Sequence, residues 1–165
     1  MRFARRLPTP YRERRTDVRS ARMIAGLVLA GGASSRFGSP KHSATIDGWS
    51  LGRIALERLT KTCTSIASVG ASLSQSITHE VLEDASAAET GPLAGVLAGL
   101  RWTAREGADW LMVTPCDVPL LPPHVLTDMA AQTRHAAAPI GLLKTPDGPH
   151  PLCSVWSTSL IGQLE

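Results

Sequence analysis

The sequence predicts an α/β domain of three layers, in which a mostly parallel sheet carries helices on both faces. Two observations favour this class. Short continuous apolar runs, typical of strands buried on both faces, recur along the chain. Between them lie segments with apolar residues at helical spacing, and strands that alternate with helices indicate a parallel sheet. With 165 residues the chain can form a single core that buries roughly 70% of the unfolded surface.

The first half of the chain contains three of these apolar runs and two helical stripes. Strands are expected over 23–30 (MIAGLVLA), 65–70 and 79–83. Ser50 is a suitable N-cap for a helix. The apolar stripe of that helix comprises Leu51, Ile54, Ala55, Leu59 and Cys63. A second helical stripe comprises Leu93, Val96, Leu97 and Leu100.

The second half continues the alternation. A buried strand is expected over 110–115 (WLMVTP), and Pro122 and Pro123 suit the first turn of a helix that ends near His135. Two strands, in APIGLLK and PLCSVW, are joined by the tight turn TPDG. A last helix begins near Ser157.

Charge is distributed unevenly. The net charge of the chain is +3, but residues 1–22 contain eight arginines against Glu13 and Asp17, so the rest of the chain is acidic. We expect residues 1–22 to be a disordered leader, or Met23 to be the true start, and residues 23–165 to form one domain. Because basic residues do not cluster on one element elsewhere, we expect no nucleic-acid partner.

Membrane insertion and a disulfide framework are both disfavoured. No apolar run approaches the roughly 20 residues of a membrane span. The three cysteines are odd in number and lack metal-ligand spacing, and the five histidines lack it too. A reducing, cytoplasmic setting is therefore expected.

The stretch LVLAGGASSRFGSPKH (27–42) follows the first strand directly, where ligands of open α/β sheets bind. Gly31, Gly32 and Gly38 allow backbone N–H groups to approach an anion, while Arg36 and Lys41 add positive charge. The stretch therefore predicts a phosphate-binding loop, with a plain surface connection as the alternative. The glycine spacing fits neither the dinucleotide fingerprint nor a Walker loop.

Asp117, in TPCDVPLLPP (114–123), follows a predicted strand at the same edge of the sheet. A carboxylate placed there, opposite Lys41, can hold Mg²⁺ that bridges nucleotide phosphates. The alternative is a turn residue that bonds its own backbone before Pro119.

Four blocks of the chain now carry a family resemblance. LAGGASSRFGSPK resembles the L-A-G-G-x-S-x-R-M-G-x-x-K signature of nucleotidyltransferases that activate sugars and molybdopterin. GPLAGVLAGL (91–100), PCDVPLLP (115–122) and HPLCSVW (150–156) are similar to motifs of one branch, the molybdenum cofactor guanylyltransferases. The resemblance implies a Rossmann-like fold of the nucleotide-diphospho-sugar transferase type.

The resemblance also implies roles for individual residues. Those it places on the nucleotide are Leu29, Ala30, Gly31, Gly32, Arg36, Lys41, Asp84 and Asp117. Asp84 would read the guanine base, whereas without the resemblance an exposed acid is the favoured interpretation of this residue. Lys41 would pair with the triphosphate, Asp117 would hold Mg²⁺, and Arg36 would complete the catalytic charge. His150 is a weaker candidate on the pterin side.

The implied reaction transfers GMP from GTP to the molybdopterin-bound molybdenum cofactor and releases pyrophosphate. Molybdoenzymes or their chaperones are the implied protein partners. The alternatives are a related nucleotidyltransferase using CTP or a sugar phosphate, and a shortened, non-catalytic GTP-binding protein. A nicotinamide oxidoreductase is disfavoured by the missing fingerprint.

Three features of the sequence depart from the family pattern. Ala71 replaces an asparagine that often lies near the nucleotide, and Phe37 replaces a methionine. The chain stops at Glu165 in a predicted helix, whereas family members continue through another helix and strand. We therefore expect a domain that is short at its C-terminus.

Overall fold

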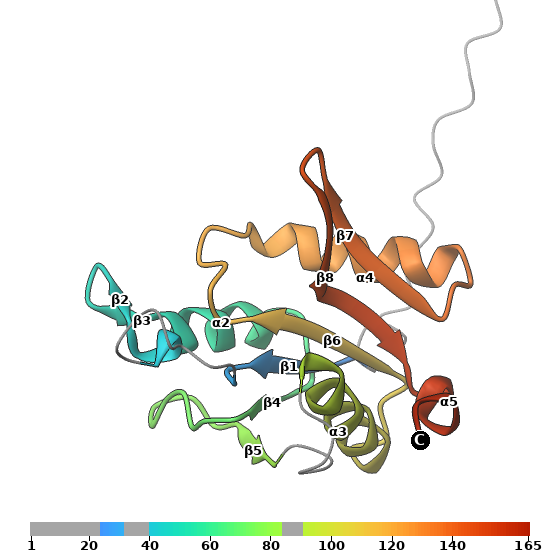
Figure 1. Ribbon diagram of the computed structural model, residues 1–165, viewed down its shortest axis with the longest axis horizontal. Helices are drawn as coiled ribbons and strands as arrows, with labels where there is room; N and C mark the ends of the chain where they lie inside the picture. The colour runs from blue at the N-terminus through green and yellow to red at the C-terminus, as the bar shows by residue number, and fades with distance from the viewer. Residues whose placement is uncertain (1–23, 32–39, 84–90) are drawn as a thin grey trace, which may run out of the picture.

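The computed structural model describes residues 24–31, 40–83 and 91–165. In this part of the chain a central sheet has the strand order β5-β4-β1-β6-β8-β7 (Figure 1). β1, β4, β5 and β6 are parallel, whereas β8 runs antiparallel to both β6 and β7. The strands are β1 (Ile24–Leu29), β4 (Ser65–Val69), β5 (Glu80–Leu82), β6 (Trp110–Pro115), β7 (Ile140–Thr145) and β8 (Gly148–Ser157).

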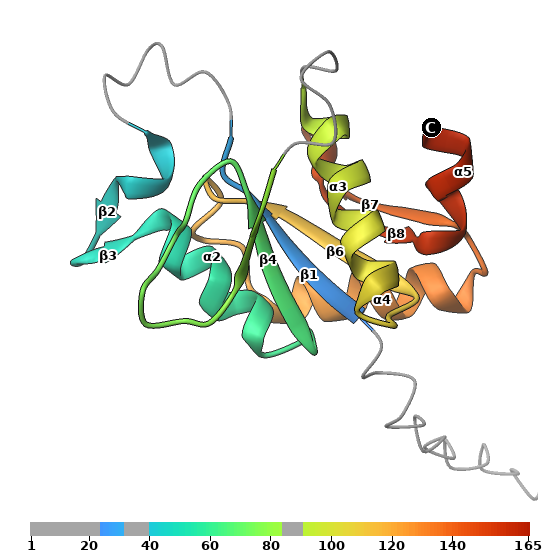
Figure 2. The ribbon, with the colours of Figure 1, turned by 90° about the horizontal axis from the view of Figure 1, so that it is seen from below.

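Helices cover both faces of this sheet. α2 and α4 lie on one face, and α3 and α5 lie on the other (Figure 2). The helices are α2 (Leu51–Thr60), α3 (Pro92–Arg105), α4 (Pro123–His135) and α5 (Ile161–Leu164), with 3-10 turns η1 (Lys41–Ser43) and η2 (Thr158–Leu160). The predicted three-layer α/β/α arrangement with a mostly parallel sheet is confirmed.

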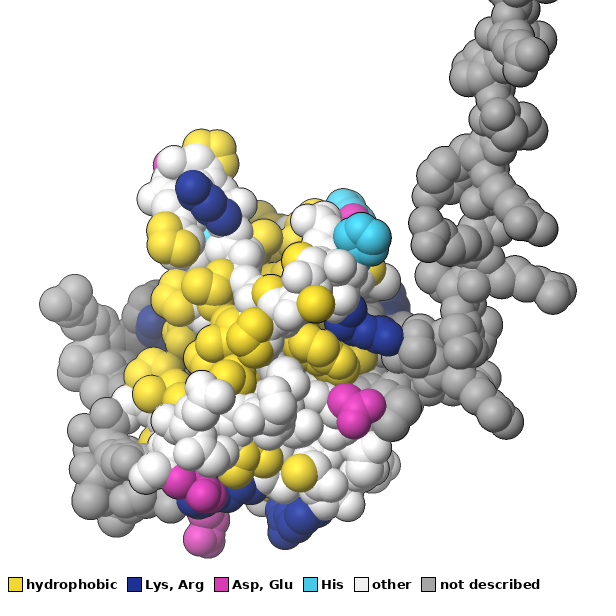
Figure 3. Space-filling view, turned by 90° about the vertical axis from the view of Figure 1, so that its right-hand side faces the viewer, with side chains coloured by type: hydrophobic (Ala, Val, Ile, Leu, Met, Phe, Trp, Pro, Cys, Tyr) yellow, Lys and Arg dark blue, Asp and Glu magenta, His cyan; other side chains and the backbone are white. Residues whose placement is uncertain are grey.

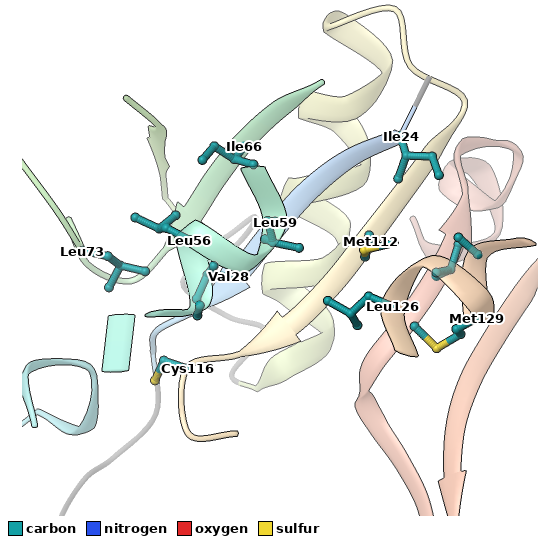
Figure 4. Close-up of a cluster of buried hydrophobic side chains, with 13 residues drawn as sticks. Ile24, Val28, Leu56, Leu59, Ile66, Leu73, Met112, Cys116, Leu126 and Met129 are labelled. Atoms are coloured by element: carbon teal, nitrogen blue, oxygen red, sulfur yellow. The ribbon is translucent and has the colours of Figure 1, made fainter. Parts of the chain in front are cut away.

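The two faces of β1 explain its unbroken apolar sequence. Ile24 and Val28 pack against α2 and α4, in the cluster that includes Leu56 and Leu126 (Figure 4). Leu27 belongs to the opposite cluster, which α3 covers. Because successive side chains of a strand point to opposite faces, a central strand covered on both sides must be apolar throughout.

The predicted helix after Ser50 is confirmed, but it ends earlier than expected. The Ser50 hydroxyl accepts a hydrogen bond from the amide of Arg53 at 3.3 Å, as an N-cap should. The helix ends at Thr60, and the Cys63 amide then bonds to the Leu59 carbonyl at 2.8 Å. Cys63 still packs against the core from this turn. Its place in the apolar stripe therefore reflects burial on the same side as the helix, although the helix itself ends three residues earlier.

The structure differs from the sequence predictions at two other places. Leu93 was placed on the buried stripe of α3 but is 53% exposed, since it lies in the first turn of the helix. A small hairpin, formed by β2 (Thr45–Ile46) and β3 (Trp49–Ser50), was not expected. Its turn contains Asp47 and Gly48, both with positive φ.

The second half of the chain agrees closely with the sequence. Pro123 is the first residue of α4, and β7 and β8 form the expected hairpin. Among the described residues, no helix is both long enough and apolar enough to cross a membrane. Figure 3 shows hydrophobic side chains gathered on the side of the molecule that carries these last strands and α5, and Leu142 of β7 is 46% exposed.

Candidate functional site

The carboxyl ends of β1 and β6 lie side by side in the centre of the sheet. The two strands are parallel, and Leu29 pairs with Pro115 at their ends. The chain leaves β1 toward β4 on one side and later enters β6 on the other side, so the strand order reverses between them. Ligands of open α/β sheets bind at such a reversal, outside the carboxyl ends of the strands.

Lys41 and Asp117 meet at this point. Lys41 lies in η1, after the β1 loop, and Asp117 follows β6. Lys41 Nζ donates a hydrogen bond to Asp117 Oδ2 at 3.1 Å, and the two side chains are 42% and 44% exposed. The structure thus brings together two of the residues for which the family resemblance implies catalytic roles, and leaves both accessible to a ligand.

A pocket of about 350 Å³ opens beside this pair. Besides Lys41 and Asp117, its walls include Ala44, Ile46, Leu51 and Pro119. Among its described lining residues, the pocket therefore combines a mostly apolar wall with the cation of Lys41 and the anion of Asp117, a composition that suits a phosphorylated ligand with an uncharged part.

The start of the predicted phosphate-binding loop lies against the end of β4. The Ala30 amide donates to the Val69 carbonyl at 3.0 Å. Gly70 has φ +93°, and a Cβ on it would lie 2.8 Å from both Cα and N of Gly31. The side chain of Leu29 is buried in the core, so only its backbone could face a nucleotide.

Other sequence-predicted site residues lie outside the described residues. These are Gly32, Arg36 and Asp84, together with the leader 1–22, Ser34, Ser35, Phe37 and Gly38. Their roles remain predictions. His150 is described: its Nε2 lies 2.8 Å from Thr145 Oγ1 across the β7–β8 hairpin, and it is not among the residues that line the pocket.

Two thiols near the pair are buried. Burial raises the pKa of the Cys116 thiol, and the neighbouring Asp117 carboxylate raises it further. Burial likewise raises the pKa of Cys153. Both thiols therefore stay protonated near neutral pH and are poor nucleophiles or metal ligands. In the described ranges, no group of three or more histidine, cysteine or acidic residues could hold a metal ion.

Arg58 was missed by the sequence analysis. Its side chain leaves α2 and reaches the loop after Asp117, where Nη1 donates to the Val118 carbonyl at 3.0 Å and Nη2 to the Pro119 carbonyl at 2.7 Å. The residue is only 7% exposed. An arginine between apolar residues of an amphipathic helix resembles an ordinary surface residue, so nothing in the sequence marked it.

Comparison with known proteins identifies the family. The model of the MobA-like NTP transferase domain matches residues 26–165. The chain belongs to this family. The matched residues thus include the predicted phosphate-binding loop, Lys41 and Asp117.

Individual relatives support this family assignment. A molybdenum cofactor guanylyltransferase of Cereibacter sphaeroides is 34% identical over 86% of this chain and 72% of its own length. One of Rhizobium meliloti is 33% identical over 84% of this chain. The chain spans 66% of the Rhizobium meliloti protein and 65% of its counterpart from Rhodopseudomonas palustris.

Solved structures place the MobA-like chain in its fold. Molybdopterin-guanine dinucleotide biosynthesis protein A of Archaeoglobus fulgidus superposes with a TM-score of 0.68 at 25% identity, over 85% of this chain and 70% of that one. A Thermus thermophilus 2-C-methyl-D-erythritol 4-phosphate cytidylyltransferase superposes with a TM-score of 0.60 at 15% identity, over 85% and 73% of the two chains. The predicted Rossmann-like fold of the nucleotide-diphospho-sugar transferase type is confirmed.

Proposed function

We propose that this MobA-like protein transfers GMP from GTP to the molybdopterin-bound molybdenum cofactor, forming the guanine dinucleotide cofactor and pyrophosphate. The observation that carries the proposal is the Lys41–Asp117 pair at the strand reversal of a MobA-like domain. The names of the relatives support the choice of nucleotide and acceptor. We place the reaction in the cytoplasm, with molybdoenzymes or their chaperones as recipients of the product.

In this reaction an oxygen of the acceptor's terminal phosphate attacks the α-phosphorus of GTP. The bond from that phosphorus to the oxygen bridging the α- and β-phosphates breaks, and pyrophosphate leaves with the electron pair. The attacking phosphate is already ionised, so no general base is needed. The protein has to align the two phosphates and neutralise their charge. Lys41 and Arg36 supply positive charge for this.

Asp117 is the proposed Mg²⁺ ligand. Carboxylate oxygens suit Mg²⁺, which proteins often hold through one or two carboxylates and the phosphates of a substrate. The half-exposed carboxylate beside a pocket, without a larger cluster of ligands among the described residues, fits an ion that arrives with the nucleotide. Mg²⁺ held by Asp117 would supply positive charge that offsets the charge of the substrate phosphates. Lys41, which is half-exposed beside the same pocket, would exchange Asp117 for a phosphate oxygen of the nucleotide.

Guanine selection is assigned to Asp84. A carboxylate can accept from the ring N–H and the exocyclic amine of guanine together, a pattern that adenine does not offer. In the sequence Asp84 follows β5, the strand at the opposite end of the sheet from β7. We thus assign base recognition to the segment after β5, and phosphate chemistry to the segments after β1 and β6.

Calorimetry with GTP, CTP and ATP, each with and without Mg²⁺, tests the proposal. We expect binding that is selective for GTP and dependent on Mg²⁺. Asp84→Ala should relax the base preference while leaving the Mg²⁺ dependence intact. Asp117→Ala should do the reverse, so the two variants serve as controls for each other.

An assay for pyrophosphate release with GTP and the molybdenum cofactor follows from selective binding. Release that requires both substrates would support the transferase. Selective GTP binding without release would favour a non-catalytic GTP-binding protein, and a preference for CTP would favour a related cytidylyltransferase. Equal or absent binding of all three nucleotides would contradict the proposal.

A further inference from the structure

The buried guanidinium of Arg58 has an unusual set of partners. Within the described part of the chain it forms no ion pair, and both of its hydrogen bonds go to neutral backbone carbonyls, those of Val118 and Pro119. Desolvation lowers the pKa of Arg58 from its ordinary value. A buried charge is unfavourable unless its donors are satisfied, so the position of these two carbonyls matters to the fold.

The two carbonyls belong to the residues that directly follow Asp117. The Val118 carbonyl also accepts the amide of Leu121 at 3.1 Å, so the turn between β6 and α4 is bonded from inside as well (Figure 1). These bonds restrain the 118–119 and 119–120 peptide groups, the stretch of backbone that directly follows Asp117. Arg58 thus contacts the backbone next to Asp117 and not the carboxylate itself.

The same helix also holds the other half of the pair. At the start of α2, the Leu51 amide donates to the Ala44 carbonyl at 2.8 Å, directly after η1, which contains Lys41. A Cβ on Gly52 would lie 3.3 Å from the His42 carbonyl oxygen, so helix and turn are in close backbone contact. One rigid helix thus contacts the Lys41 segment at its N-terminal end and the Asp117 segment near its C-terminal end.

We propose that Arg58 is a positioning residue of the transferase site, and that through it α2 sets the separation of Lys41 and Asp117. The part of this inference that concerns phosphates and Mg²⁺ rests on the proposed function. The part that concerns the order of the loop after Asp117 does not. It assigns to α2 a role in aligning the phosphates and Mg²⁺, in addition to its role in the core.

Three variants test the role: Arg58→Met, Arg58→Lys and Arg53→Met. Arg53 is the matched control, because it lies on the same helix but forms a surface pair with Glu57 at 3.0 Å and stacks 3.6 Å above the Trp49 ring. Arg58→Lys retains the charge and can reach one carbonyl, so it should restore part of what Arg58→Met loses. It also serves as the test variant if Arg58→Met does not fold.

The first readout is amide hydrogen exchange of the ligand-free protein. We expect Arg58→Met to raise exchange at Leu121 and its neighbours at least about tenfold, as expected for a loop that loses two charge-assisted bonds, with little change in the middle of β6. Arg53→Met should leave this loop unchanged. Unchanged exchange at Leu121 in Arg58→Met would overturn the inference, whether or not the protein binds GTP.

The second readout is the Mg²⁺ concentration that half-saturates GTP binding. For Arg58→Met we expect this concentration to rise about tenfold, while affinity for GTP without Mg²⁺ changes little and Arg58→Lys lies between. A general loss of stability would weaken both kinds of binding together, and that result would overturn the positioning role. Failure of the wild type to bind GTP contradicts the proposed function, and the exchange measurement then still decides whether Arg58 orders the loop.

Discussion

Lys41 Nζ lies 3.1 Å from Asp117 Oδ2 although 76 residues separate the two in the chain. Both side chains are more than two-fifths exposed. Exposed ion pairs contribute little to stability, typically about 0–1 kcal/mol. The fold therefore gains little from this contact, and its value lies in presenting a cation and an anion at one point of the sheet edge.

Replacing either partner should separate function from stability. We expect Lys41→Met and Asp117→Asn each to change the free energy of unfolding by less than about 1 kcal/mol. Lys41→Met should nevertheless lose a charge-assisted bond to phosphate, worth roughly 1.5–3 kcal/mol, and Asp117→Asn a charged oxygen ligand for Mg²⁺, so each should weaken Mg²⁺-dependent GTP binding about tenfold to a hundredfold. Urea denaturation and calorimetry of both variants and the double variant measure these effects. A large change in stability with unaltered binding would contradict this assignment.

Gly70→Ala should disturb the start of the phosphate loop. The residue has φ +93°, and its new Cβ would lie 2.8 Å from the Gly31 backbone. Gly107→Ala is the matched control, because Gly107 has φ +72° but open space around it. Both variants incur the strain of a left-handed alanine, about 1–2 kcal/mol, and Gly70→Ala should lose a further 1–3 kcal/mol, roughly, from the contact. Equal losses in urea denaturation would show that Gly31 simply moves away.

Gly99→Ala should overpack the core between α3 and the sheet. An added Cβ would lie 2.6 Å from Leu27 Cδ2 and 2.9 Å from Leu111 Cδ2. The expected loss in the free energy of unfolding is about 1–3 kcal/mol, since these side chains are fully buried. Gly162→Ala in α5 meets nothing within 4 Å and should be neutral or stabilising by up to about 1 kcal/mol. Thermal and urea unfolding of the pair test the difference, which would vanish if the core can relax.

The buried thiol of Cys63 should lower the free energy of unfolding in alkaline solution. Burial raises the pKa of this thiol from 9.0 to about 12. The folded protein therefore retains a proton that the unfolded chain releases. The corresponding stability is fully present below pH 9 and declines as the pH rises toward 12, by at most about 1.4 kcal/mol per pH unit.

Cys63→Ala removes this titration and should flatten the decline in the free energy of unfolding above pH 9 relative to the wild type. Urea denaturation at a series of pH values measures both slopes, and other alkaline groups cancel in the comparison. Identical slopes would mean that water reaches the thiol in the folded state.

The sheet and its helices could be predicted because a strand buried on both faces requires a continuous apolar run, which is easily recognised in the sequence. β6 was expected at 110–115 and lies at Trp110–Pro115, since every residue between its turns must be apolar or small. The small hairpin was missed although a signal existed: Asp-Gly at 47–48 is a strong hairpin turn, but its strands of two residues show no alternation. Short strands are specified by their turn alone.

Parts of the site could not be predicted from the sequence for a different reason. Lys41 and Asp117 were expected to meet because both follow parallel strands at one edge. Arg58 reaches its carbonyls 60 and 61 residues away, and no periodicity or motif encodes such a contact. A hydrogen bond from a side chain to a distant backbone carbonyl depends on how the helix and the loop pack together. That packing cannot be predicted from the local sequence pattern.

The central position of β1 sets an order of events for the growing chain. Of the strands in the described residues β1 is synthesised first, yet one of its two edges pairs with β6, from Ile24 with Trp110 to Leu29 with Pro115. Until β6 has emerged from the ribosome, a fully apolar strand has an open edge and an incomplete cover. Such delayed, non-local pairing slows folding and exposes nascent chains to aggregation. Demand for chaperones should therefore be greatest before residue 115 leaves the exit tunnel, and it should subside once β6 has taken its place.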